Sequence, residues 1–177
     1  MKKFVKSMCW IMLLAASAGS ALAVQQTQSN DQSQPLVRGS YQKIIAAHAG
    51  KPFIVALWSV SCTHCGGDLE IFERLAQKYT EFSLVLISTD SAEQGAVISR
   101  SLKQYHLGQP GPKQKRAGRV ESWVFADSYT ERLRYEIDAQ WYGELPRTYF
   151  YDANGKATGI SGVLDADKIE QWLLGTP

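Results

Sequence analysis

The sequence feature that most constrains the fold is a run of six apolar residues followed closely by a helical pattern. The run is Phe53–Trp58, and it shows no alternation of polar and apolar side chains. Such a run is typical of a central strand that is covered on both faces. Residues 66–79 then place Leu69, Phe72 and Leu75 on one stripe at helical spacing. A buried strand that leads into an amphipathic helix predicts an α/β fold.

The rest of the chain continues this alternation. Hydrophobic spacing, capping residues and turn residues predict helices over 40–49 and 128–138, strands over 82–88 and 123–125, and a hairpin of 147–152 and 156–163. A further helix begins at Ser91, where Gln94 closes a capping box. The last helix begins at Asp165, with a hydrophobic staple of Leu164 and Ile169. We therefore expect an α/β domain with a mixed central sheet flanked by helices.

The N-terminal 23 residues predict a secretory signal peptide. Lys2, Lys3 and Lys6 form a basic head, residues 8–23 carry no charge, and Ala21-Leu22-Ala23 has the small-x-small pattern of a cleavage site. The uncharged stretch is shorter than the ~20 apolar residues of a spanning helix, so an uncleaved anchor is the weaker alternative. Cleavage after Ala23 implies a secreted mature protein.

Cleavage changes the charge and the cysteine content. The full chain has a formal net charge of +2, and the signal contains three lysines and no acids, so the mature chain is close to neutral. This balance gives no reason to expect nucleic acid as a partner. Only Cys62 and Cys65 remain, in a compartment where disulfides persist. Residues 24–37, rich in Gln, Ser and Asn, predict a disordered linker, and residues 38–177 a single domain that we expect to be monomeric.

The segment Cys62-Thr63-His64-Cys65 lies between the first strand and the helix that follows it. The N-terminus of a helix presents unpaired N–H groups and the positive end of the helix dipole, which both favour a thiolate. We therefore expect Cys62, at the exposed edge, to be the nucleophile and Cys65, one turn further, to be the buried resolving thiol. A protonated His64 beside them lowers the pKa of a neighbouring thiol.

The cysteine pair has three other interpretations. An inert bridge is disfavoured because so short a loop removes little entropy from the unfolded chain. Half of a zinc site is disfavoured because the chain has neither a second CxxC nor a spaced pair of histidines. A copper(I) carrier using Cys62, Cys65 and His64 stays open as the alternative function, since thiolates are soft ligands. Otherwise we expect no metal and no cofactor besides the redox-active Cys62–Cys65 disulfide.

The pattern Trp58-(x)3-Cys62-x-x-Cys65 at a strand-to-helix junction resembles the thioredoxin superfamily. The signal peptide and the helix-rich middle make the chain similar to the periplasmic TlpA/ResA-type branch. A second motif, Leu145-Pro146-Arg147-Thr148, is similar to the family's cis-proline segment. The resemblance covers residues 38–177. It implies a thioredoxin-like fold, a cis Leu145–Pro146 bond, packing of Pro146 against the disulfide, and backbone hydrogen bonds from Leu145 to a substrate chain.

The chain departs from the family pattern beside the cysteines. Thioredoxins carry a buried acid two residues before the active-site Trp, and this chain has Ala56 there. Glu144, just before the proline segment, is a candidate substitute, although an exposed turn is its more usual setting. His64 resembles a residue of the DsbA oxidant's dipeptide, which stabilises a thiolate. We expect Thr63, His64 and Trp58 to tune the reactive thiol.

Together these patterns predict a periplasmic thiol–disulfide oxidoreductase that exchanges disulfides with protein substrates. We expect it to act as a reductase supplied by a membrane electron-transfer partner. The sequence does not name the substrate or the redox partner. The basic residues of the segment 113–119 are typical of a solvated loop.

Overall fold

The computed structural model describes residues 33–108 and 118–175. The predicted signal peptide, most of the predicted linker and most of the basic loop 113–119 lie outside the described residues. In the part of the chain that is described, no helix is long and apolar enough to cross a membrane.

A six-stranded mixed sheet forms the centre of the molecule, with strand order β1-β4-β3-β2-β5-β6. The strands are β1 Gln34–Leu36, β2 Phe53–Trp58, β3 Ser83–Ser91, β4 Arg119–Phe125, β5 Arg147–Tyr151 and β6 Ala157–Ser161. Strands β1, β4, β3 and β2 pair in parallel with one another, whereas β5 pairs antiparallel with both β2 and β6. The predicted mixed sheet is therefore confirmed, and β2 lies inside it.

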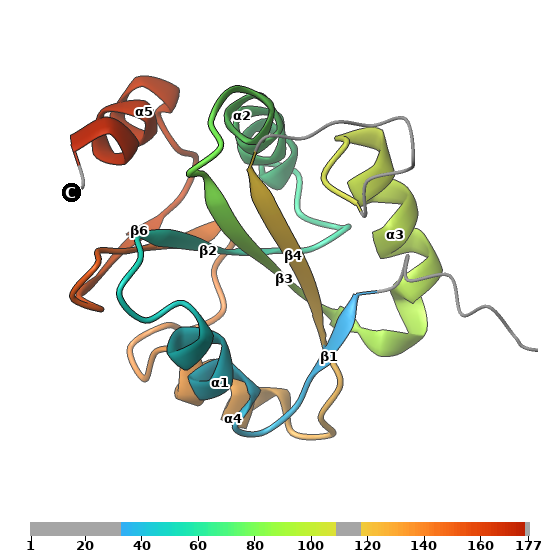
Figure 1. Ribbon diagram of the computed structural model, residues 1–177. Coiled ribbons are helices and arrows are strands. Elements are labelled where there is room, and N and C mark those ends of the chain that lie inside the picture. The colour runs from blue at the N-terminus through green and yellow to red at the C-terminus, as the bar shows by residue number, and fades with distance from the viewer. Residues whose placement is uncertain (1–32, 109–117, 176–177) are drawn as a thin grey trace, which may run out of the picture.

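Helices cover both faces of the sheet. They are α1 Ser40–Ala47, α2 Cys65–Lys78, α3 Gly95–Gln104, α4 Thr130–Ile137 and α5 Ala166–Gly175, with a short 3-10 helix η1 Ala92–Gln94 before α3. Side chains of α2, α3 and α5 share one core cluster, and those of α1 and α4 share a second. Figure 1 shows α2 and α5 above the sheet and α1 and α4 below it.

The apolar run that predicted β2 divides its side chains between these two clusters. Ile54, Ala56 and Trp58 face the first, and the alternate residues of the strand face the second. Every residue of β2 is buried. Full burial of a large apolar side chain stabilises the fold by about 1.5–3 kcal/mol. The buried side chains of β2 therefore fix the position from which the segment after Trp58 leaves the sheet.

The structure differs from the predicted linker at its C-terminal end. Gln34–Leu36 form β1, paired with residues Trp123–Phe125 of β4. The Leu36 side chain is only 1% exposed, within the core below the sheet. A three-residue strand is too short to show an alternating pattern, and the backbone of β4 and an apolar cluster distant in sequence hold it in place.

Other boundaries shift by smaller amounts. The capping box of Ser91 and Gln94 is confirmed, and it precedes η1. Ser40, a candidate N-cap in the sequence, is instead the first residue of α1: Gly39 is the N-cap residue, and the Ser40 hydroxyl accepts a hydrogen bond from the Val37 N–H. Arg119, expected in the basic loop, begins β4 because its segment pairs with β3.

Candidate active site

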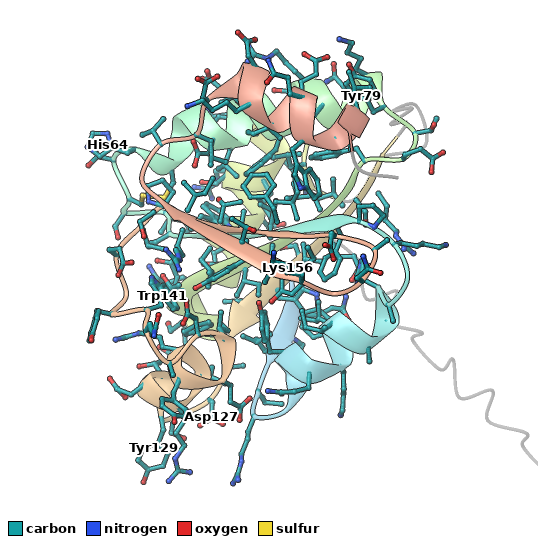
Figure 2. The ribbon with its side chains drawn as sticks, turned by 90° about the vertical axis from the view of Figure 1, so that its left-hand side faces the viewer. His64, Tyr79, Asp127, Tyr129, Trp141 and Lys156 are labelled. Atoms are coloured by element: carbon teal, nitrogen blue, oxygen red, sulfur yellow. A yellow bond between two sulfur atoms is a disulfide. The ribbon has the colours of Figure 1, made fainter. Side chains whose placement is uncertain are left out.

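Cys62 and Cys65 form a disulfide where β2 leads into α2, with their Cα atoms 5.5 Å apart. The Cys62 N–H donates to the carbonyl of Ser59, and the Cys65 N–H to the carbonyl of Cys62. Cys65 is 2% exposed, whereas Cys62 is only partly buried. Figure 2 shows the disulfide at one edge of the molecule, near His64. Access is therefore unequal, and a partner reaches the sulfur of Cys62 more readily.

The side chains that the sequence assigns to tuning this pair have different environments. Thr63 and His64 are exposed, and His64 is the N-cap residue of α2. Trp58 is buried at the end of β2, and its indole N–H has no hydrogen-bond partner among the described residues. The three residues are thus close to the cysteines in the chain, and their tuning role stays a prediction.

The proline motif lies at the same end of the sheet. The Leu145–Pro146 peptide bond is cis, as the resemblance implies. Arg147 of β5 is opposite Leu57 of β2, which brings Pro146 to the end of β2 from which the cysteine segment departs. Pro146 is buried, and Leu145 packs against the same core cluster as Cys62.

Glu144 forms its hydrogen bonds within the loop before the proline and with β6. Its carboxylate accepts hydrogen bonds from the Ser161 hydroxyl and the Tyr142 N–H, and its carbonyl accepts from the Trp141 indole. Partial burial raises the pKa of Glu144, but hydrogen bonds from its own N–H, Ser161 and Tyr142 outweigh it and hold the pKa below its usual value. Glu144 is an exposed, ionised carboxylate that fixes a turn, so the hypothesis that it substitutes for a buried acid is not supported.

The buried acid is instead Asp68, which sequence reasoning missed. Asp68 is 3% exposed and lies on α2, three residues after Cys65. One carboxylate oxygen accepts from the Leu164 N–H, and the other is buried with no partner in the described residues. Burial raises the pKa of Asp68, and the Leu164 N–H offsets this only in part. The spacing from Cys65 was the available signal, because residues three apart share a helix face.

The site shows no sign of a metal centre. Within residues 33–108 and 118–175, no three His, Cys, Asp or Glu side chains converge on a point where an ion would be held. Cys62 and Cys65 are bonded to each other, and His64 is exposed. The geometry therefore gives the copper alternative no specific support.

No protein-family model and no curated protein sequence matches the chain. Several solved structures are similar to it. A thiol:disulfide interchange protein of the thioredoxin family from Chlorobium tepidum is 16% identical with a TM-score of 0.56, over 74% of this chain and 83% of that one. A secreted disulfide oxidoreductase of Mycobacterium tuberculosis is 17% identical with a TM-score of 0.53, over 73% and 85%. A putative DsbE from Chlorobium tepidum is 23% identical with a TM-score of 0.50, over 74% and 83%. These likenesses show the fold, which is thioredoxin-like as expected.

Proposed function

We propose that this protein, built on the thioredoxin-like fold, is a thiol–disulfide oxidoreductase that acts on protein substrates through Cys62 and Cys65. The observation that carries the proposal is the disulfide itself. It joins an accessible sulfur to a buried one at the N-terminus of α2, and the register of β5 brings Pro146 to the same end of β2. Two of the structural neighbours named above are a disulfide oxidoreductase and a thiol:disulfide interchange protein, which supports the same chemistry here.

In the reducing direction the dithiol form begins the reaction. The Cys62 thiolate attacks one sulfur of a substrate disulfide, so that a Cys62–substrate bond forms and the other substrate sulfur leaves as a thiolate. The Cys65 thiolate then attacks the Cys62 sulfur and releases the second substrate sulfur. Two electrons pass to the substrate, and the protein returns to the disulfide that the structure holds. The reverse sequence oxidises a substrate dithiol.

The two thiols need different assistance. Cys62 precedes α2 by three residues, where the orphan N–H groups and the dipole of the helix stabilise a thiolate. Cys65 is buried, and burial opposes its ionisation. Asp68, one helical turn further and with a raised pKa, is the base that we propose to take the Cys65 proton when the mixed disulfide is resolved.

We propose the reducing direction for the physiological reaction. Burial gives Cys65 no stabilised thiolate in the dithiol form, and it is a stabilised thiolate that makes such a couple oxidising. A protonated His64 has the opposite effect, since a nearby positive charge stabilises a thiolate and makes the couple more oxidising. A potential near or below ~−250 mV supports the reductase, which then needs a membrane electron donor, whereas a value near ~−120 mV identifies an oxidant.

The same proposal places the protein in the periplasm as a monomer. The basic head, uncharged stretch and Ala21-Leu22-Ala23 site of the N-terminus support export and cleavage. The first expected observation is an exported protein that begins at Val24. An N-terminus at Met1 in the exported protein would favour the uncleaved anchor.

The decisive experiment traps the mixed disulfide. Cys65→Ser removes the resolving thiol, so Cys62 should stay bonded to its substrates, and the adducts should appear on a non-reducing gel of a periplasmic extract and disappear with dithiothreitol. Cys62→Ser is the matched control and should trap nothing and exchange nothing. If Cys65→Ser traps nothing while the wild type reduces insulin disulfides, the two-cysteine mechanism is wrong.

A further inference from the structure

An irregularity in β3 directs two of its side chains toward the segment that carries Cys62. The register with β4 shifts between Ser88 and Ser91, which leaves Thr89 and Asp90 outside the ladder. Bulges of this kind redirect side chains and recur beside active sites. Here the Thr89 hydroxyl donates to the carbonyl of Trp58 at 3.4 Å, and Asp90 reaches the next two residues.

The Asp90 carboxylate accepts three hydrogen bonds. The Ser59 hydroxyl donates to one oxygen at 2.7 Å, and the Val60 N–H and the Ser88 hydroxyl donate to the other at 2.9 and 2.6 Å. Hydrogen bonds to an ionised acceptor are about twice as strong as neutral ones. A single carboxylate on β3 therefore binds the backbone and a side chain of the segment that follows β2.

Ser59 extends this attachment to the cysteine. Since its only hydroxyl proton goes to Asp90, its oxygen accepts both the N–H and the hydroxyl of Ser61, at 3.1 and 2.9 Å. The Ser59 carbonyl accepts the Cys62 N–H at 3.1 Å. A continuous series of hydrogen bonds thus runs from Asp90 to the backbone of Cys62.

The two redox forms depend on this series to different extents. In the disulfide form Cys62 is also tied to α2 through its bond to Cys65. Reduction breaks that bond, so in the dithiol form the hydrogen bonds from β3 are the attachment that we infer to hold the Cys62 segment. We propose that Asp90 is a positioning residue that holds Cys62 in place in the dithiol form and thereby sets its reactivity and the redox equilibrium. The redox part of this inference rests on the proposed function.

The test compares Asp90→Ala with a matched control, Asp152→Ala. Asp152 also accepts two backbone N–H groups, from Asn154 and Lys156, but in the turn at the opposite end of β5 from Pro146. Loss of Asp90 should destabilise the dithiol form more than the disulfide form. The equilibrium constant with glutathione should shift about tenfold toward the disulfide, or ~30 mV more reducing, and mixed-disulfide formation should slow. Asp152→Ala should change neither.

Unfolding in urea, with the disulfide intact and after reduction, keeps the inference separate from the proposed function. Asp90→Ala should lower the free energy of unfolding more in the reduced protein, whatever the wild type does to substrates. Equal losses in the two forms, with an unchanged glutathione equilibrium, would overturn the inference and leave the proposed function intact. A wild type that exchanges no disulfide overturns the proposed function alone. Ser59→Ala removes one donor to Asp90 and the oxygen that accepts from Ser61. It interrupts the same series of hydrogen bonds and should give differences in the same direction, which keeps the test decisive if Asp90→Ala does not fold.

Discussion

At the scale of single residues, the site depends on which carboxyl groups are buried. Glu144 attracts attention in the sequence because it precedes the proline motif, but it is exposed and bound within its own loop. Asp68 attracts none, because a single acid in an amphipathic helix is normally solvated. Its burial against the N–H of Leu164 leaves α2 with an acid, three residues after Cys65, whose pKa is raised.

Asp68→Asn should make the stability of the protein less dependent on pH. Between the unfolded pKa of about 3.9 and the higher folded pKa, folded Asp68 keeps a proton that the unfolded chain releases. Wild-type stability therefore falls as pH rises through this window and stays lower above it, by about 1.4 kcal/mol for each unit of pKa difference. Asn keeps the acceptor for Leu164 and has no such loss.

Urea unfolding of the disulfide forms at pH 4 to 8 measures this difference. The variant should approach the wild type near pH 4 and be the more stable of the two at pH 7, while it resolves mixed disulfides more slowly. Parallel stability profiles across this range would show that Asp68 is not the group we describe.

At the scale of elements, the N-terminus of α2 leaves room for a side chain from the end of α3. Two glycines follow Cys65. A Cβ on Gly66 would lie 2.8 Å from the hydroxyl oxygen of Tyr105, whereas a Cβ on Gly67 would meet nothing within 4 Å. Tyr105 is the C-cap residue of α3, so the missing side chain at Gly66 leaves room for the Tyr105 hydroxyl against the first turn of α2.

The two glycines should therefore respond differently to substitution by alanine. Gly67→Ala should stabilise the protein by up to about 1 kcal/mol, because alanine is the better helix former and the space is open. Gly66→Ala should stabilise it less or destabilise it, since Tyr105 must move. The free energy of unfolding of each variant in urea gives the comparison, and equal gains would contradict the packing described here.

Elements defined by local patterns were predicted well. Strand β2 has the predicted bounds, and the box of Ser91 and Gln94 precedes η1. The staple residues Leu164 and Ile169 are buried in one cluster before and within α5. The box and the staple lie among neighbouring residues, and the unbroken apolar run of β2 marks a buried strand by itself. Strand β1 was missed because three residues are too short to carry such a pattern and its partner, β4, is distant in the sequence.

At the scale of the whole molecule, the redox state of one short loop should alter the stability of the entire domain. The folded chain holds the two sulfurs in position to bond, and it buries one of them almost completely. A reductase has a folded disulfide form that is more stable than its folded dithiol form, relative to the unfolded chain. By linkage, each ~30 mV by which folding lowers the potential corresponds to about 1.4 kcal/mol.

We expect the disulfide form to unfold at a higher urea concentration than the dithiol form. Cys62→Ser cannot form the disulfide and is the control. Its free energy of unfolding should be the same with and without dithiothreitol. A dithiol form that is the more stable of the two would make the protein an oxidant, and would give His64 the larger part in setting the potential.

The sequence by itself determined the strand, the CxxC segment and the helix that follows them, and it located the proline motif. These features depend on the order of neighbouring residues, which local patterns record. Only the tertiary structure decided the partners of the two acids that we propose to act at the site. Asp90 lies 31 residues from Ser59, and Asp68 lies 96 residues from Leu164. These pairs meet because the sheet places β3 beside β2, and because the segment before α5 packs against α2. Such hydrogen bonds depend on the topology of the whole chain, and no periodicity within a single segment encodes them.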